Sequence, residues 1–144
     1  MKGMSYDFSL RDRVSGETVQ LPFKHVMKGG MYQVDPETMQ PVPIAEARLN
    51  ITFNYSDYYY EATKGNKDFE IDGDNGGIKS LHGKTGLESI KMLDNMIKNI
   101  EKKHPNLETS NNYWDSCPGN AVKPLYQLKT MAELRPDAVW DVSY

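Results

Sequence analysis

The clearest pattern in the chain is a strict alternation of apolar and polar residues over positions 47–56. The apolar positions are Ala47, Leu49, Ile51, Phe53 and Tyr55, and the polar positions between them are Arg48, Asn50, Thr52, Asn54 and Ser56. A period of two residues predicts a β-strand, with one face on the core and the other facing water or a ligand. We therefore expect one continuous strand across this stretch.

Shorter segments of the same kind lie before it. Tyr6, Phe8 and Leu10 alternate within SYDFSL, and VSGE supplies turn residues before TVQLP, so a β-hairpin is predicted here. KGGMYQV predicts another strand after a Gly-Gly bend, and DPETMQPVP reads as a Pro-rich turn. Residues 64–79 are dense in Gly, Asp, Asn and Lys, which indicates a long, mobile polar surface loop.

The second half of the chain changes to a helical period. In residues 86–103 the apolar positions are spaced by three and four: Leu87, Ile90, Leu93, Ile97 and Ile100. This predicts an amphipathic helix that ends before His104-Pro105. A second helix is expected from about residue 120 or 123 to 135, where Pro136 stops it. Its inner face would carry Val122, Leu125, Leu128 and Ala132.

The order of these elements predicts the fold class. The tail AVWDVSY reads as a final strand or docked segment, with Trp140 in the core and Arg135 paired with Asp137 or Asp141. Strands come first and helices later, without alternation, so the class is α+β. We expect an antiparallel sheet of N-terminal and central strands packed against two C-terminal amphipathic helices. A chain of 144 residues has the length of one ordinary domain, so we expect positions 1–144 to form a single compact domain.

Composition narrows the classes of partner. The formal net charge is −3, which argues against broad nucleic-acid binding, since that mode needs a basic face. No stretch approaches the roughly 20 apolar residues that span a bilayer, and MKGMSYDFSL lacks the apolar run of a signal peptide. We therefore expect no membrane partner and a cytoplasmic location.

The tripeptide Gly83-Lys84-Thr85 resembles the end of a phosphate-binding loop. The first glycine of that motif would have to stand at Ile78, and no buried strand precedes it, so we reject this reading. Thr85 followed by Glu88 instead predicts a capping box at a helix start. A helix start attracts anions, so we keep the hypothesis that His82, Lys84 and Thr85 contact a phosphate or a partner's carboxylate.

The sequence predicts neither a metal site nor a catalytic constellation. DFEIDGDNGG begins like a calcium loop but places Lys79 where a bidentate carboxylate is needed. The histidines, His25, His82 and His104, lie at no zinc-ligand spacing from one another or from Cys117, the single cysteine. We therefore assign no catalytic residue, no metal ligand and no cofactor.

Polar and aromatic side chains mark a candidate ligand face. Arg48, Asn50, Thr52 and Asn54 would project from one face of the predicted strand, roofed by Tyr58, Tyr60 and Trp114. Aromatic planes beside amides and cations suit a base or nucleotide. The alternative is an ordinary exposed sheet face. Lys123 and Tyr126 on the second helix join the candidate set, with a plain solvated helix face as their alternative.

Four segments together resemble a known family. NITFNYS…YYYEA, GKTGLESIKML, GNAVKPLYQL and RPDAVWD resemble a family of small uncharacterised proteins carried by bacteriophages, prophages and other mobile elements. The similarity covers about residues 48–141 and the turn RDRVSGE. It implies no assigned activity. It does imply a host-takeover or counter-defence setting in the host cytoplasm, where small proteins bind a host protein or sequester a signalling nucleotide.

We therefore expect a non-catalytic accessory protein that binds a host protein or a nucleotide-type ligand. Two alternatives remain open. The first is a small enzyme acting on a phosphoester or nucleotide, with Lys84, His82, Cys117 or an aspartate converging in one pocket. The second is a homo-oligomeric structural module with a symmetric apolar patch from Met92, Met96 or Met131.

Overall fold

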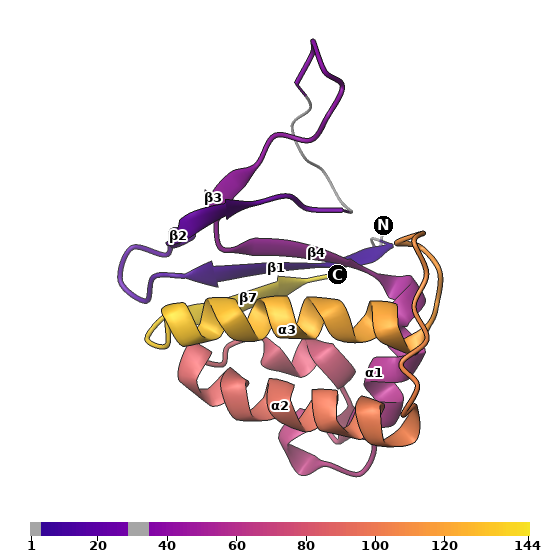
Figure 1. The fold of residues 1–144 in the computed structure, drawn as a ribbon. Helices are drawn as coiled ribbons and strands as arrows, with labels where there is room; N and C mark the ends of the chain where they lie inside the picture. Colours follow the sequence, from indigo (N-terminus) through magenta and orange to yellow (C-terminus); the bar gives the residue numbers. More distant parts are fainter. Residues whose placement is uncertain (1–3, 29–34) are drawn as a thin grey trace.

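The structure is a computed structural model that describes residues 4–28 and 35–144. Its strands are β1 (Ser5–Arg11), β2 (Gln20–His25), β3 (Ile44–Glu46), β4 (Arg48–Thr52), β5 (Glu70–Ile71), β6 (Asp74–Asn75) and β7 (Val139–Ser143). The α-helices are α1 (Ser56–Thr63), α2 (Gly86–Lys103) and α3 (Pro118–Leu134), and the short 3-10 helices are η1 (Phe53–Tyr55), η2 (Lys67–Phe69) and η3 (Gly77–Leu81) (Figure 1). Apart from Lys28, the strand expected over 28–34 lies outside the described residues.

A three-stranded antiparallel sheet forms the centre of the fold. Its order is β4-β1-β7, so the N-terminal strand is the middle one. Phe8 on β1 lies opposite Leu49 on β4 and Val142 on β7, and all three side chains are buried. Because side chains alternate along a strand, Tyr6 and Leu10 extend this row on the same core face. The predicted α+β class, with an antiparallel sheet and C-terminal helices, is confirmed.

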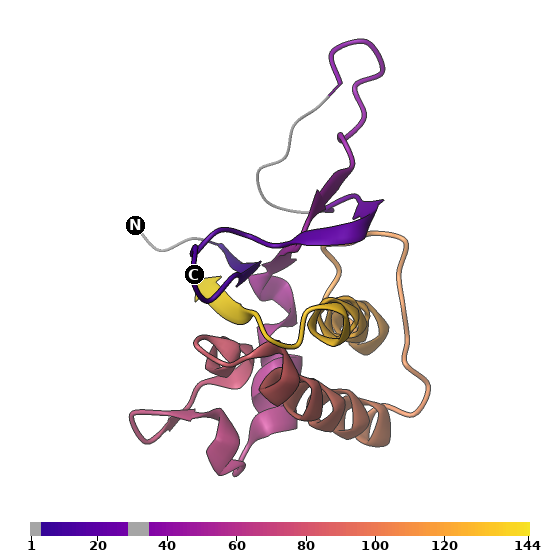
Figure 2. The same ribbon diagram turned by 90° about the vertical axis from the view of Figure 1, so that its left-hand side faces the viewer.

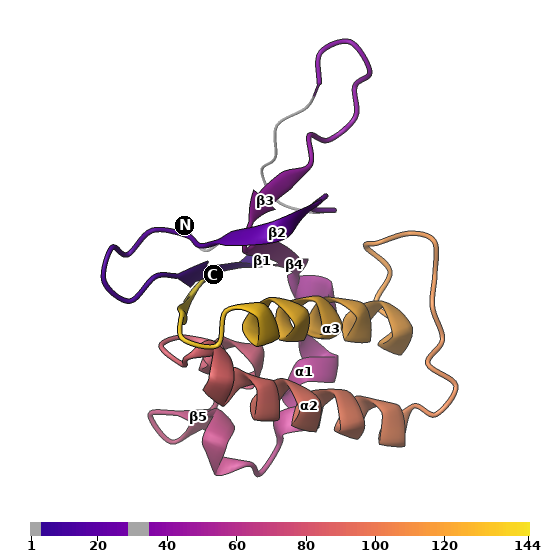
Figure 3. The same cartoon turned by 60° about the vertical axis from the view of Figure 1, so that its left-hand side comes forward.

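Two antiparallel helices cover one face of the sheet, with α3 nearer to it than α2 (Figures 1 and 3). The bounds predicted for the first helix, 86–103, are confirmed. One residue of its expected apolar stripe is wrong, because Leu87 is 68% exposed. The buried stripe runs through Gly86, Leu93 and Ile97. Successive residues of a helix are about 100° apart around its axis, so Leu87, which directly follows Gly86, points away from this stripe.

The alternating segment 47–56 is only partly a strand. The strand β4 ends at Thr52, whose Oγ1 accepts a hydrogen bond from the Asn54 N–H at 3.2 Å and caps η1. The chain then continues into α1, and Tyr55 at the end of η1 is buried at helical spacing with Tyr59 and Ala62 of α1. A local side-chain cap therefore overrides the alternation, and the expectation of one strand through Ser56 is wrong.

Residues 64–79 contain short ordered elements where an irregular loop was expected. The strands β5 and β6 form a small hairpin, and Phe69 and Ile78 on either side of it are buried in the core. Asp72 (φ 52°) and Gly73 (φ 85°) take the left-handed conformation that a two-residue hairpin turn requires. The dipeptide Asp72-Gly73 is itself a sequence signal for this turn.

The N-terminal hairpin forms only at its root. The Val19 N–H donates to Leu10 O at 2.9 Å, but β2 then leaves the sheet and pairs with β3. Figure 2 shows this two-stranded ribbon projecting away from the body of the molecule. Asp12 closes the turn by accepting the N–H groups of Val14 and Ser15, and these bonds hold the pKa of Asp12 below its usual value.

Two expectations for the C-terminal part also need correction. The second helix begins at Pro118, earlier than residue 120, since proline suits the first helical position. Asp141 pairs with Arg11, whose Nε lies 3.0 Å from Asp141 Oδ2, and Arg135 instead donates to Gln20 O at 3.5 Å. The tail does form a strand, β7, and Trp140 is buried as predicted, with 1% of its surface exposed.

Candidate functional site

A hollow of about 380 Å³ lies between the first half of α3 and the loop 104–117. We call it the α3 pocket. Its lining consists of two lysines, three tyrosines, Pro124 and uncharged polar residues: Lys28, Lys123, Tyr55, Tyr113, Tyr126, Ser110, Asn111, Asn120 and Gln127. This volume is within the range of small-molecule sites.

The α3 pocket is locally positive although the chain as a whole is negative. Its described lining contains Lys28 and Lys123 and no carboxylate, whereas the formal net charge of the chain is −3. Lys123 Nζ donates to Thr109 Oγ1 at 3.1 Å, and within the described residues neither lysine has a carboxylate within ion-pair distance. Both ammonium groups are therefore available to an anion.

One buried amide, Asn120, forms four hydrogen bonds with the loop beside the pocket. Its Oδ1 accepts from Thr109 Oγ1 at 2.8 Å and from the Ser110 N–H at 3.2 Å. Its Nδ2 donates to the carbonyl oxygens of Asn112 and Asp115 at 3.0 and 3.4 Å. Asn120 lies inside the first turn of α3, and its side chain positions the wall of the pocket.

The loop also packs unusually close to α3 at Gly119. The Gly119 N–H donates to Glu108 O at 2.7 Å. A Cβ atom at this position would lie 2.6 Å from Leu107 O and 2.7 Å from Glu108 O, which is closer than real Cβ contacts. Gly119 thus permits the approach of the loop to the helix, and with Asn120 it builds the pocket.

Two neutral tyrosines connect the pocket to the sheet. The Tyr113 hydroxyl accepts from the Thr52 N–H at 3.0 Å and donates to Asn50 O at 3.1 Å, bridging the outer edge of β4. The Tyr55 hydroxyl donates to Tyr113 O, and the two rings meet edge to face at 5.7 Å. Burial raises the pKa of both phenols, so they remain protonated donors at neutral pH.

The third tyrosine of the pocket is half-exposed. Tyr126 donates its hydroxyl to Glu101 Oε2 on α2 at 3.0 Å, and 45% of its surface is exposed. Partial burial and the hydrogen bond to Glu101 raise the pKa of Tyr126. Its ring lines the pocket while its hydroxyl is already occupied, so the ring offers an aromatic surface.

The polar row predicted on the strand over 47–56 does not lie on one exposed face of β4. Asn50 and Thr52 are buried, and Asn50 Nδ2 donates to Asp7 Oδ1 at 2.7 Å and Ser5 Oγ at 2.8 Å. Arg48 is exposed and lies 3.7 Å from Glu46. The strand ends before Asn54, so the four side chains do not share one accessible surface.

The aromatic residues expected to roof that row are also placed differently. Asn54 Nδ2 donates to Trp114 O at 2.8 Å, and the Tyr58 hydroxyl donates to Ser116 O at 3.5 Å, so both residues hold the loop 104–117. The Tyr60 ring instead faces Lys79, whose Nζ lies 5.6 Å from its centroid. Of the twelve predicted site residues, Lys123 and Tyr126 line the α3 pocket.

The segment His82–Gly86 has a structural role along the outer edge of β7. The Gly83 N–H donates to Trp140 O at 2.9 Å, and the Gly86 N–H donates to Ala138 O at 2.8 Å. His82 Nδ1 accepts the Val142 N–H at 3.0 Å, so the ring is held against the backbone of β7. Asp141 Oδ1 lies 3.6 Å from the same Nδ1.

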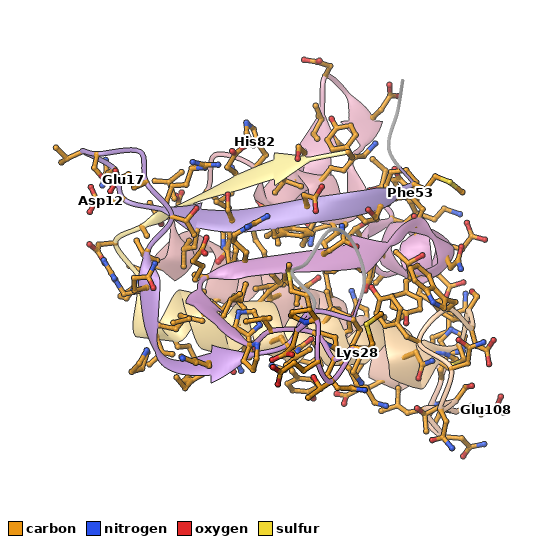
Figure 4. The ribbon with its side chains drawn as sticks, turned by 90° about the horizontal axis from the view of Figure 1, so that it is seen from above. Asp12, Glu17, Lys28, Phe53, His82 and Glu108 are labelled. Atoms are coloured by element: carbon orange, nitrogen blue, oxygen red, sulfur yellow. The ribbon has the colours of Figure 1, made fainter. Side chains whose placement is uncertain are left out.

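The predicted capping box at Thr85 is confirmed. Thr85 Oγ1 accepts the Glu88 N–H at 3.1 Å, and Glu88 Oε1 accepts the Thr85 N–H at 3.0 Å. Every backbone N–H from Gly83 to Glu88 has an acceptor within the protein. This start of α2 therefore presents no free backbone donors to a phosphate. In Figure 4, which views the molecule from above, His82 lies beside β7, and Lys28 lies toward the opposite edge of the sheet, beyond β4.

The groups named for the enzyme alternative meet only in part. His82 and Lys84 line one hollow together with Asp68, and Asp141 lies next to His82, whereas Cys117 is the last residue of the loop 104–117, directly before α3. Apart from the contact between His82 and Asp141, no hydrogen bond or ion pair within residues 4–28 and 35–144 joins any two of these side chains. In the same residues, no three acidic, histidine or cysteine side chains are grouped for metal binding.

Neither protein-family models, nor curated proteins, nor solved structures match this chain. In the described part of the chain, no helix has both the length and the apolar character that crossing a bilayer requires. The geometry of the α3 pocket therefore carries the functional argument.

Proposed function

We propose that this protein is a non-catalytic binding protein that sequesters a nucleotide-type ligand in the α3 pocket. The single observation that supports this most directly is the lining itself: within the described residues, the hollow is lined by two lysines without a carboxylate partner and by the half-exposed Tyr126 ring, and no carboxylate lines it. A ligand with an aromatic ring and a negative charge would satisfy both features.

The physical chemistry of such a ligand matches the pocket. Lysine ammonium groups form charge-assisted hydrogen bonds with phosphate, which are about twice as strong as neutral ones. A base stacked on an aromatic side chain contributes roughly 1–3 kcal/mol. The wall formed by the loop 104–117 is already held in place by Asn120, so less ordering is required when a ligand binds.

The biological setting is part of the proposal. The resemblance of four segments to small phage and mobile-element proteins supports an accessory role in counter-defence, in which a signalling nucleotide of the host is removed from solution. Binding of a host protein is the competing version. It would use exposed groups such as the Trp114 side chain, which is 51% exposed.

Calorimetry against nucleoside phosphates, cyclic dinucleotides and ADP-ribose tests the proposal. We expect at least one ligand to bind with sub-millimolar affinity, and Lys123→Gln to weaken it at least tenfold, about 1.4 kcal/mol. Lys98→Gln on α2 is the matched control, because Lys98 is exposed and lies outside the pocket. If no ligand binds, or if both variants lose the same affinity, the α3 pocket is not a nucleotide site and a host protein becomes the better candidate.

A further inference from the structure

The α3 pocket has room for one nucleoside unit. At about 380 Å³ it is near the lower end of ligand sites, which span roughly 300–1,000 Å³. Ligands with two nucleoside units, such as cyclic dinucleotides, need the upper part of that range. The size of the pocket therefore favours a mononucleotide among the ligands that the proposed function allows.

The charge of the pocket favours a terminal phosphate. A phosphate monoester carries about −1.5 to −2 charges at neutral pH, whereas a phosphodiester carries about −1. Lys28 and Lys123 come from different parts of the fold, the segment that follows β2 and the first half of α3. Two ammonium groups neutralise one monoester phosphate and leave no excess charge for a triphosphate chain.

Two amide side chains are suited to the edge of a base. Asn111 and Gln127 line the pocket, and neither forms a side-chain hydrogen bond within the described residues. An amide offers both a donor and an acceptor, as the hydrogen-bonding edge of a nucleobase does. Tyr126, which lines the same hollow, offers the ring against which a base can stack.

We propose that the α3 pocket binds one nucleoside 5′-monophosphate, with the phosphate between Lys28 and Lys123 and the base beside Tyr126. This inference rests on the proposed function, and it narrows the ligand class to a single nucleoside with one terminal phosphate.

Calorimetry with AMP, GMP, CMP and UMP, the parent nucleosides, inorganic phosphate and a cyclic dinucleotide tests this assignment. We expect at least one monophosphate to bind tenfold or more tightly than its nucleoside and than the cyclic dinucleotide. Lys28→Gln and Lys123→Gln should each lower the affinity for the monophosphate at least tenfold and leave nucleoside binding unchanged. Tyr126→Leu should weaken nucleoside and monophosphate alike.

The outcomes separate this inference from the proposed function. Tighter binding of the cyclic dinucleotide, with loss of affinity in Lys123→Gln, would overturn the mononucleotide assignment and leave the nucleotide-binding function standing. Equal binding of nucleoside and monophosphate would overturn the role of the two lysines. No binding of any ring-bearing anion would overturn both. Lys98→Gln controls for the change in net charge, and circular dichroism confirms that each variant is folded.

Discussion

The indole Nε1–H of Trp140 donates a hydrogen bond to Ser89 Oγ over 2.8 Å, joining β7 to α2 in the interior. Ser89 Oγ in turn donates to Gly86 O at 2.8 Å, so one buried hydroxyl connects the sheet with the first turn of the helix. The Trp140 ring also meets Phe8 edge to face at 6.0 Å. This contact orients the final strand on the central one.

Ser89→Ala should destabilise the protein by roughly 1–3 kcal/mol, because the buried Trp140 N–H would lose its acceptor. Urea unfolding followed by tryptophan fluorescence measures this change. Ser116→Ala is the control, since Ser116 is exposed and its side chain forms no hydrogen bond within the described residues. Equal midpoints for the two variants would show that the Trp140–Ser89 bond contributes nothing to stability.

Thr85→Ala should cost about 1 kcal/mol, because it removes the hydroxyl that caps α2. The loss should appear as a lower denaturation midpoint with an unchanged dependence on denaturant. Thr130→Ala is the matched control. Its hydroxyl bonds Tyr126 O one turn back within α3, where it caps nothing. A control variant as unstable as Thr85→Ala would contradict the capping role.

Asn120→Asp should loosen the wall of the α3 pocket. The substitution keeps the shape of the side chain but turns a donor into an acceptor facing the carbonyl oxygens of Asn112 and Asp115. We expect a loss of roughly 1–3 kcal/mol in stability and faster amide exchange in the loop 104–117. Asn106→Asp adds the same charge at an exposed position. Slow exchange retained in Asn120→Asp would show that the loop is held by other contacts.

The buried tyrosines predict unfolding in alkali. Burial raises the pKa of Tyr6 from 10.0 to about 12, and it also raises the pKa of Tyr55, Tyr59 and Tyr113. Since the unfolded chain releases these protons at lower pH, the stability they contribute is complete below pH 10 and is lost as the pH rises through the folded values. Tyrosinate absorbance and circular dichroism recorded together should change cooperatively above pH 10. Independent titration of all nine tyrosines near pH 10 without unfolding would contradict this.

Elements with local signals were predictable from the sequence. The helix 86–103 was located at both ends because Thr85 and Glu88 satisfy each other's backbone donors and His104-Pro105 disfavours continuation. Two local signals were available and were missed. Asp72-Gly73 indicated a hairpin turn, and Pro118 indicated the first residue of α3.

The end of β4 shows how a local contact defeats a clear pattern. The alternation of apolar residues continues through Tyr55. The Thr52 hydroxyl nevertheless caps a helical turn, and Tyr55 reaches the core as part of η1 and not as part of a strand. The alternation shows only which side chains are apolar. It does not show whether a backbone N–H, such as that of Asn54, donates to a neighbouring strand or to a side chain two residues away.

The sequence by itself determined the α+β class, the two C-terminal helices, the cap at Thr85 and the buried position of Trp140, because each depends on periodicity or on neighbours within one helical turn. Only the tertiary structure decided the α3 pocket. Lys28, Tyr55, Tyr113 and Tyr126 come from four separate segments, and their meeting depends on Asn120 and Gly119 drawing the loop 104–117 onto α3. Contacts between residues that are distant in the chain produce no periodic pattern in the sequence, so the pocket could not be predicted before the packing of these segments was known.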